Sequence, residues 1–333
     1  AKPRLLEVLE TVGGLARTLA EFARRHVALP MVGRTHMQPA MPSSVGLWAS
    51  AHAESLLDDA GLLLPAYSMN DQCPLGSAAS YGVPLPIDRQ LVSDLLGFSR
   101  PIHNVLYANN TRGKIEYVIL SALAGVMGSL SRLAQDLILW SMPEFGYFTL
   151  PSGFCTGSSI MPQKRNPDVL ELVRARAAVV ASGAALVSEL IRAAPSGYNR
   201  DVQEAKGAFI KGLAITRDSL RILKRLFEGV TVNPKALRAA FTPDVFATDR
   251  ALELVAGGMP FRDAYHHVKA HLEDLERMDP DQAIARKTHL GAPAGLDVQA
   301  DLARSREIVR FSQEERKKLE KVFSKLMGFT WHL

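Results

Sequence analysis

Apolar residues recur along this chain at steps of three and four, the spacing that places side chains on one face of a helix. The first stripe consists of Leu5, Val8, Leu9, Val12, Leu15, Leu19 and Phe22. Alternating runs of β-branched residues, which would indicate strands, are almost absent. The sequence therefore predicts an all-α fold.

Prolines and glycines separate the expected helices. A proline lacks a backbone donor and restricts the residue before it, so we expect residues 29–42, with their three prolines, to form a loop. The first expected helix ends at about residue 25. The other expected helices cover residues 43–64, 88–96, 108–140, 167–192 and 201–227. The helix at 108–140 is apolar nearly all round in its first half, which is typical of a helix buried inside a bundle.

Turn signals become denser after Asn233-Pro234, and the expected helices become shorter. This change divides the chain into a central helical bundle domain with catalytic loops, residues 1–234, and a smaller C-terminal helical domain, residues 235–333. A chain of 333 residues is long enough for one large or two medium domains.

Composition narrows the class of protein. With 47% hydrophobic and 22% charged residues, the chain resembles an ordinary globular protein. The net charge of +5 suits an anionic small molecule and gives no support for nucleic acid as a partner.

The longest uncharged apolar stretch, 117–131, is shorter than the roughly 18 residues that span a bilayer, so we expect no membrane partner. Cys73 and Cys155 are too few for a disulfide framework, which favours a reducing, cytoplasmic compartment.

The segment that carries the most chemical information reads TGSSIMPQKRNPD, residues 156–168. Its glycine and serines indicate a mobile loop, and Asn166-Pro167-Asp168 is the pattern of a helix start, with Asn166 as the N-cap. A helix N-terminus next to Lys164 and Arg165 could hold an anion. The alternative is a solvated basic loop before an ordinary helix.

This segment resembles the signature loop of the fumarase, aspartase and argininosuccinate lyase superfamily, which has Gly-Ser-Ser, Met-Pro, Lys and Asn at these spacings. Gln163 and residues 168–174 are similar to argininosuccinate lyases rather than to fumarases or adenylosuccinate lyases. Other similar segments are 35–39, 74–77, 197–206, 247–249 and 258–262. The resemblance implies a long-helix bundle of the fumarase/aspartase type. It also implies a carbon–nitrogen lyase of arginine biosynthesis or the urea cycle, which converts L-argininosuccinate to L-arginine and fumarate by β-elimination, without a cofactor.

The resemblance assigns the base to Ser158, the first serine of Gly-Ser-Ser. A serine hydroxyl is a poor base unless its alkoxide is stabilised, and Lys164, loop amides and the helix N-terminus could supply that stabilisation. Asn166 matches a family residue that holds the substrate or the loop. His36 matches the histidine of the family's Thr-His motif and Glu171 its carboxylate partner; such a pair could manage the leaving-group proton.

Thr35, Tyr198, Gln203 and Lys206 match family positions that hold the substrate. Without the resemblance, a loop histidine such as His36 is more often exposed or structural, and Gln203 and Lys206 could belong to an ordinary polar helix face. His267 and His271 are four residues apart, but no glutamate follows the first histidine as in zinc proteases, so we predict no metal.

Members of the family are homotetramers whose active sites draw residues from three subunits, so that His36 and Ser158 would meet across chains. Family chains also carry an N-terminal domain of roughly the first quarter of the sequence, and we expect this chain, which begins without Met inside a helix, to lack it. Many members have Asp at the position of Tyr107, whereas Arg112 matches. The alternatives are a non-catalytic, crystallin-like or truncated scaffold of the same fold, and a lyase that releases fumarate from another substrate such as adenylosuccinate.

Overall fold

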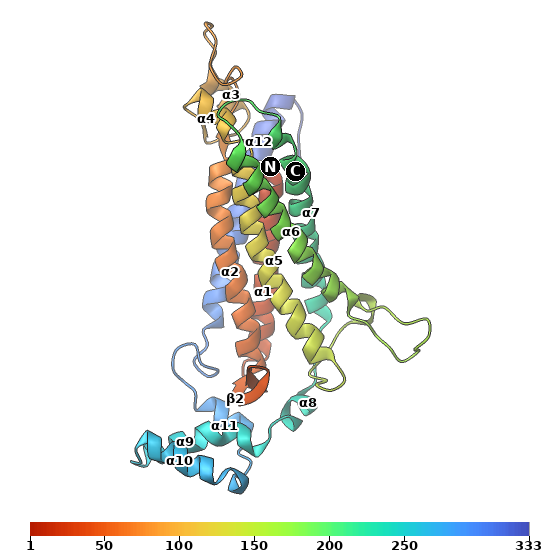
Figure 1. Ribbon diagram of the computed structural model, residues 1–333, viewed down its shortest axis with the longest axis vertical. Coiled ribbons are helices and arrows are strands. Elements are labelled where there is room, and N and C mark those ends of the chain that lie inside the picture. The colour runs from red at the N-terminus through yellow and green to blue at the C-terminus, as the bar shows by residue number, and fades with distance from the viewer. Residues whose placement is uncertain (333) are drawn as a thin grey trace.

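Long antiparallel helices dominate the computed structural model, which describes residues 1–332 (Figure 1). The long helices are α1 (Lys2–Arg25), α2 (Val45–Asn70), α5 (Lys114–Ser141), α6 (Asp168–Ala193), α7 (Ala205–Gly229) and α12 (Val298–Met327). They run up and down one bundle, with both termini near the same end. The predicted all-α fold is confirmed.

Helix α1 lies in the centre of the bundle and packs against α2, α7 and α12. All seven residues of its apolar stripe are at most 1% exposed. Burying such side chains stabilises the fold by roughly 1.5–3 kcal/mol each. The helical spacing of the N-terminal sequence therefore identified a central element of the core.

Helix α5 is long and apolar enough to cross a membrane by length and composition, but half of its most apolar window is buried inside the protein. Its neighbours are α2, α6 and α7. Burial of this kind is typical of the core helix of a bundle.

Short elements lie at both ends of the bundle. At the end with the termini are β3 (Gln72–Cys73), α3 (Arg89–Leu95), β4 (Arg100–Pro101) and α4 (Val105–Asn110). At the opposite end are β1 (Pro30–Thr35), β2 (Gln38–Ser44), β5 (Phe148–Thr149), β6 (Thr231–Val232), α8 (Pro234–Ala239), α9 (Ala247–Ala256), α10 (Phe261–Ala270) and α11 (Pro280–Ala285). Four 3₁₀ turns complete the described elements: Ser152–Phe154, Asp201–Gln203, Pro243–Phe246 and Leu272–Asp274.

The expected loop at 29–42 was wrong, because these residues form the antiparallel hairpin β1–β2. Prolines are tolerated there since each strand of a two-stranded ribbon keeps one edge without a partner strand. The expected end of the second helix before Pro65 was also wrong. Helix α2 continues because Ala66 and Tyr67, 1% and 2% exposed, pack into the core beyond the proline.

The single helix expected at 108–140 is divided into α4 and α5. Gly113 separates them with a φ of +78°, which a residue with a side chain rarely adopts. A Cβ atom there would also lie 2.3 Å from Ile191. The helix expected from residue 201 begins as a 3₁₀ turn before α7.

The division into residues 1–234 and 235–333 stays a prediction. The structure adds that α12, in the second range, packs along α1 and shares the main core through Val298, Leu302, Ile308 and Leu319. Helices α9 and α10 contribute to a small separate cluster around Ala251, Ala264 and Val268.

Candidate active site

The residues predicted to form the site lie at three separate places in one chain. Thr35 ends strand β1 and His36 begins the hairpin turn, at one end of the bundle. The loop that contains Ser158 joins α5 to α6 and projects from the side of the bundle (Figure 1). Tyr198 lies beyond the other end of α6, near the termini. One chain alone therefore does not bring the predicted residues together.

A short backbone bridge closes the Ser158 loop. Thr156 and Asn166 donate to each other's carbonyl oxygens, at 3.1 and 2.8 Å. The Asn166 side chain does not cap α6 as predicted; its Nδ2 donates to the carbonyl oxygen of Gly157 at 3.3 Å. Helix α6 begins one residue later, with Pro167 at the N-cap position and without a side-chain cap. The Asn166 side chain therefore braces the loop and does not cap the helix.

Two backbone amides point at the hydroxyl of half-buried Ser158. The N–H groups of Ile160 and Met161 donate to its Oγ at 3.3 and 3.1 Å. Hydrogen bonds to the charged form of a group favour that form, so these two donors would stabilise an alkoxide if the Ser158 hydroxyl lost its proton. The sequence suggested loop amides in general, but only the backbone geometry identifies these two donors.

Two other predicted residues flank this loop. Lys164 is exposed, and its backbone N–H donates to the carbonyl oxygen of Met161 at 3.0 Å, which tightens the loop on its far side. Glu171 is exposed in the first turn of α6, where a carboxylate interacts favourably with the helix dipole. His36 and Glu171 lie on different elements and form no hydrogen bond with each other among the described residues.

His36 occupies the tight turn between β1 and β2. His36 and Met37 are the two residues between paired Thr35 and Gln38, and their φ angles are +52° and +64°. Positive φ at both central positions is characteristic of a type I′ hairpin turn. The turn leaves His36 exposed at the tip of the hairpin.

The third place surrounds Tyr198, whose side chain is 65% exposed. The Arg112 guanidinium carbon lies 4.4 Å from the centre of the Tyr198 ring, and Nη1 donates to the carbonyl oxygen of Asn199 at 3.2 Å. Asn110 accepts a hydrogen bond from the Gly197 N–H at 2.8 Å and donates to Ser196 Oγ at 3.3 Å. These bonds attach the turn before α7 to helix α4.

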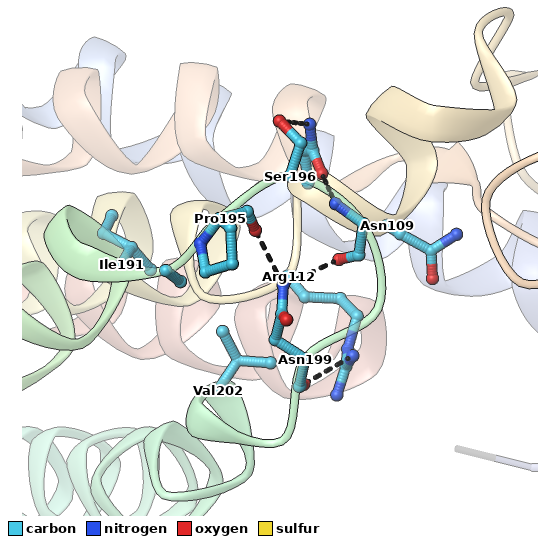
Figure 2. A pocket seen from close by; sticks show the side chains of 10 residues that line it. Asn109, Arg112, Ile191, Pro195, Ser196, Asn199 and Val202 are labelled. Atoms are coloured by element: carbon cyan, nitrogen blue, oxygen red, sulfur yellow. Dashed lines mark hydrogen bonds between the residues drawn. The ribbon is translucent and has the colours of Figure 1, made fainter.

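A small polar pocket of about 170 Å³ lies beside this turn. Figure 2 shows its lining side chains. The side chains of Asn109 and Arg112 from one segment and Ser196 and Asn199 from the other line it, with Ile191 and Val202 on its apolar side. Gln203 and Lys206 are exposed just beyond the pocket, at the start of α7. Tyr198, Gln203 and Lys206 thus share one end of the bundle.

No group of three or more His, Cys, Asp or Glu side chains within residues 1–332 has the geometry to hold a metal ion. His271 Nδ1 lies 2.7 Å from the carbonyl oxygen of His267, one helical turn earlier.

Comparison with known proteins shows the family to which this chain belongs. The lyase family model matches residues 1–182. The argininosuccinate lyase of Sorangium cellulosum is 45% identical over 298 residues, 90% of this chain and 69% of the relative. That of Xanthomonas campestris is 40% identical over 92% of this chain and 70% of the relative. That of Parabacteroides distasonis is 38% identical over 96% of this chain and 72% of the relative.

Solved structures agree on the fold. An EDDS lyase in complex with formate superposes with a TM-score of 0.86 at 23% identity, over 98% of this chain and 73% of that one. A class II fumarase from Schistosoma mansoni superposes with a TM-score of 0.70 at 18% identity, over 95% of this chain and 66% of that one.

Proposed function

Because this chain belongs to the argininosuccinate lyase family, we propose that it converts L-argininosuccinate to L-arginine and fumarate. The observation that carries the proposal is the identity of 38–45% with argininosuccinate lyases over at least 90% of the chain. The reaction is a β-elimination in arginine biosynthesis. A proton leaves the carbon next to a carboxylate, the carbon–nitrogen bond breaks, and a carbon–carbon double bond forms.

Ser158 is the proposed base. Removal of a weakly acidic proton requires an alkoxide, whose negative charge must be stabilised. The amides of Ile160 and Met161 support this role because both already donate to Ser158 Oγ. Lys164, on the same closed loop, would add positive charge as the substrate carboxylate takes on the charge of the intermediate. Asn166 would hold the loop and the substrate.

His36 and Glu171 are the proposed pair that delivers a proton to the departing guanidinium nitrogen. Thr35, Tyr198, Gln203 and Lys206 would bind the ends of the substrate. Since one chain holds these groups at three distant places, we propose that a homotetramer assembles each site from several subunits. An exposed apolar stripe on α6 supports the assembly: Leu172, Val179 and Leu186 recur every seven residues and are 51%, 41% and 48% exposed. The enzyme would work in the cytoplasm.

The test is to incubate the chain with argininosuccinate and follow fumarate by its ultraviolet absorbance. The parent and a Ser159→Ala control should release fumarate, whereas Ser158→Ala should lose at least roughly 100-fold in kcat, the effect expected when a general base is removed. Ser159 is a suitable control because it is the exposed neighbour on the same loop. Absence of fumarate from the parent would contradict the proposed reaction. Equal activity in parent and Ser158→Ala would contradict the proposed base.

A further inference from the structure

Arg34, the residue before Thr35 in β1, binds across the turn that carries His36. Its Nη1 donates to the carbonyl oxygen of Met37 at 3.0 Å. Its guanidinium carbon lies 5.0 Å from the centre of the Phe145 ring and 5.8 Å from that of Trp140. Nε is buried and has no hydrogen-bond partner among the described residues. Two aromatic rings therefore lie beside this half-buried cation, within the distance of a cation–π contact.

The two rings lie where α5 ends and the Ser158 loop begins. Trp140 is in the last turn of α5 and Phe145 follows it, and both pack against Tyr147 with ring centres 5.6 Å apart. Trp140 and Tyr147 are 7% and 2% exposed, so this aromatic cluster is a rigid part of the core. Arg34 thus connects the turn that carries His36 to the base of the loop that carries Ser158.

The turn requires such support because of its backbone. His36 and Met37 both have positive φ angles although neither is glycine. For residues with a side chain this conformation costs roughly 1–2 kcal/mol each. It persists only where surrounding structure holds it, and it is often found at functional sites. The pairing of Thr35 with Gln38 closes the turn, and the hydrogen bond from Arg34 to Met37 adds a side-chain contact across it.

We propose that Arg34 is a positioning residue, which fixes the left-handed turn against the aromatic cluster and so aims the His36 imidazole at the leaving group. The inference rests on the proposed function, because it gives His36 its task. Arg34 acts through geometry and does not touch the substrate. A misplaced imidazole would slow proton delivery while leaving substrate binding at the other places intact, so the effect falls on kcat rather than KM.

The test compares Arg34→Met and Arg34→Lys with Arg25→Met. Arg25 is a matched control, since it also stacks on a buried ring, Phe22 at 5.8 Å, at the same end of the bundle. We expect kcat to fall roughly tenfold or more in both Arg34 variants, because a misplacement of about 1 Å can cost 100-fold. Lysine keeps the charge but lacks the planar group that stacks and donates in this geometry. KM should change little, and Arg25→Met should behave like the parent.

A second substitution, at Met37, distinguishes support of the turn by Arg34 from a direct role of the Arg34 charge. Glycine adopts positive φ without cost, so Met37→Gly should restore part of the kcat that Arg34→Met loses and change the parent little. Hydrogen–deuterium exchange at residues 35–38 should rise in Arg34→Met and not in Arg25→Met. An unchanged kcat in Arg34→Met, an equal loss in Arg25→Met or a failure of the rescue would each overturn the inference. If the parent shows no turnover, the proposed function is contradicted instead. In that case the exchange measurement still tests the inference, because unchanged hydrogen–deuterium exchange at residues 35–38 in Arg34→Met would overturn it.

Discussion

Thr156 and Asn166 exchange two backbone hydrogen bonds, of 3.1 and 2.8 Å, and thereby close residues 157–165 into a loop with a fixed neck. Within this loop Ser158 Oγ accepts the N–H groups of Ile160 and Met161. The neck keeps these three groups together although most of the loop is exposed. Two main-chain bonds therefore close the loop in which Ser158, the proposed base, receives its two hydrogen bonds.

Opening the neck should expose the loop to trypsin, which cleaves after Lys164 and Arg165. Thr156→Pro removes the N–H that donates to Asn166, a loss of about 1 kcal/mol that raises the open population about fivefold. Thr156→Ala keeps this N–H and is the control. We expect faster cleavage of the folded protein and a lower kcat in Thr156→Pro alone. Equal cleavage of both variants would show that the bridge does not restrain the loop.

A charge on the apolar stripe of α6 should disrupt the proposed assembly. Val179→Glu places a carboxylate in the middle of the stripe, and burying an unpaired charge costs several kcal/mol. We expect light scattering after size exclusion to show a smaller assembly and the assay to show loss of turnover. Leu252→Glu, at a 48% exposed position on α9, is the control and should leave the mass unchanged. A full-size assembly of Val179→Glu would place the subunit contact elsewhere.

Gly46 should resist substitution because α2 begins directly against the end of α1. A Cβ atom at this position would lie 2.4 Å from Val27 Cα and 2.9 Å from the Ala23 carbonyl oxygen, and neither backbone can yield easily. We expect Gly46→Ala to lower the free energy of unfolding by about 2–3 kcal/mol. Gly61→Ala, on the same helix with no atom within 4 Å, should be neutral or stabilising by up to about 1 kcal/mol. Chemical denaturation at one protein concentration measures both.

Asp301 should make stability depend on pH. The residue is 3% exposed, and burial raises its pKa above the usual value of an aspartate, although Ser50 donates to it at 2.7 Å and Arg304 is near. Protonation of Asp301 is therefore more favourable in the native state than in the unfolded state. The stability that this difference contributes is complete below about pH 3.9, the unfolded-state pKa, and is lost as the pH rises through the raised native-state pKa.

Asp301→Asn stays neutral and can still accept the hydrogen bond from Ser50. The gain in unfolding free energy over the parent should therefore be larger at pH 7 than at pH 3.5. Asp263→Asn, at an exposed position on α10, should show no such gain. A gain for Asp301→Asn that is the same at both pH values would contradict the assignment.

Local sequence determined the parts of this protein that depend on neighbours in the chain. The stripe from Leu5 to Phe22 predicted α1 and its burial, because helical spacing alone places these side chains on one face. The segment 156–168 predicted a loop before a helix and indicated a lyase, since the motif lies within a few residues. The comparisons confirmed the family.

Tertiary structure decided the features that depend on distant residues. Helix α2 continues beyond Pro65 because Ala66 and Tyr67 pack into the core. The proline-rich segment after His36 is a strand because it pairs with β1. The Asn166 side chain donates to the carbonyl oxygen of Gly157 and does not cap α6, although its local sequence favours a cap. The support of the His36 turn by Arg34 comes from rings more than a hundred positions away in the sequence. No local pattern records such contacts, because their free energy arises only when separate elements pack together.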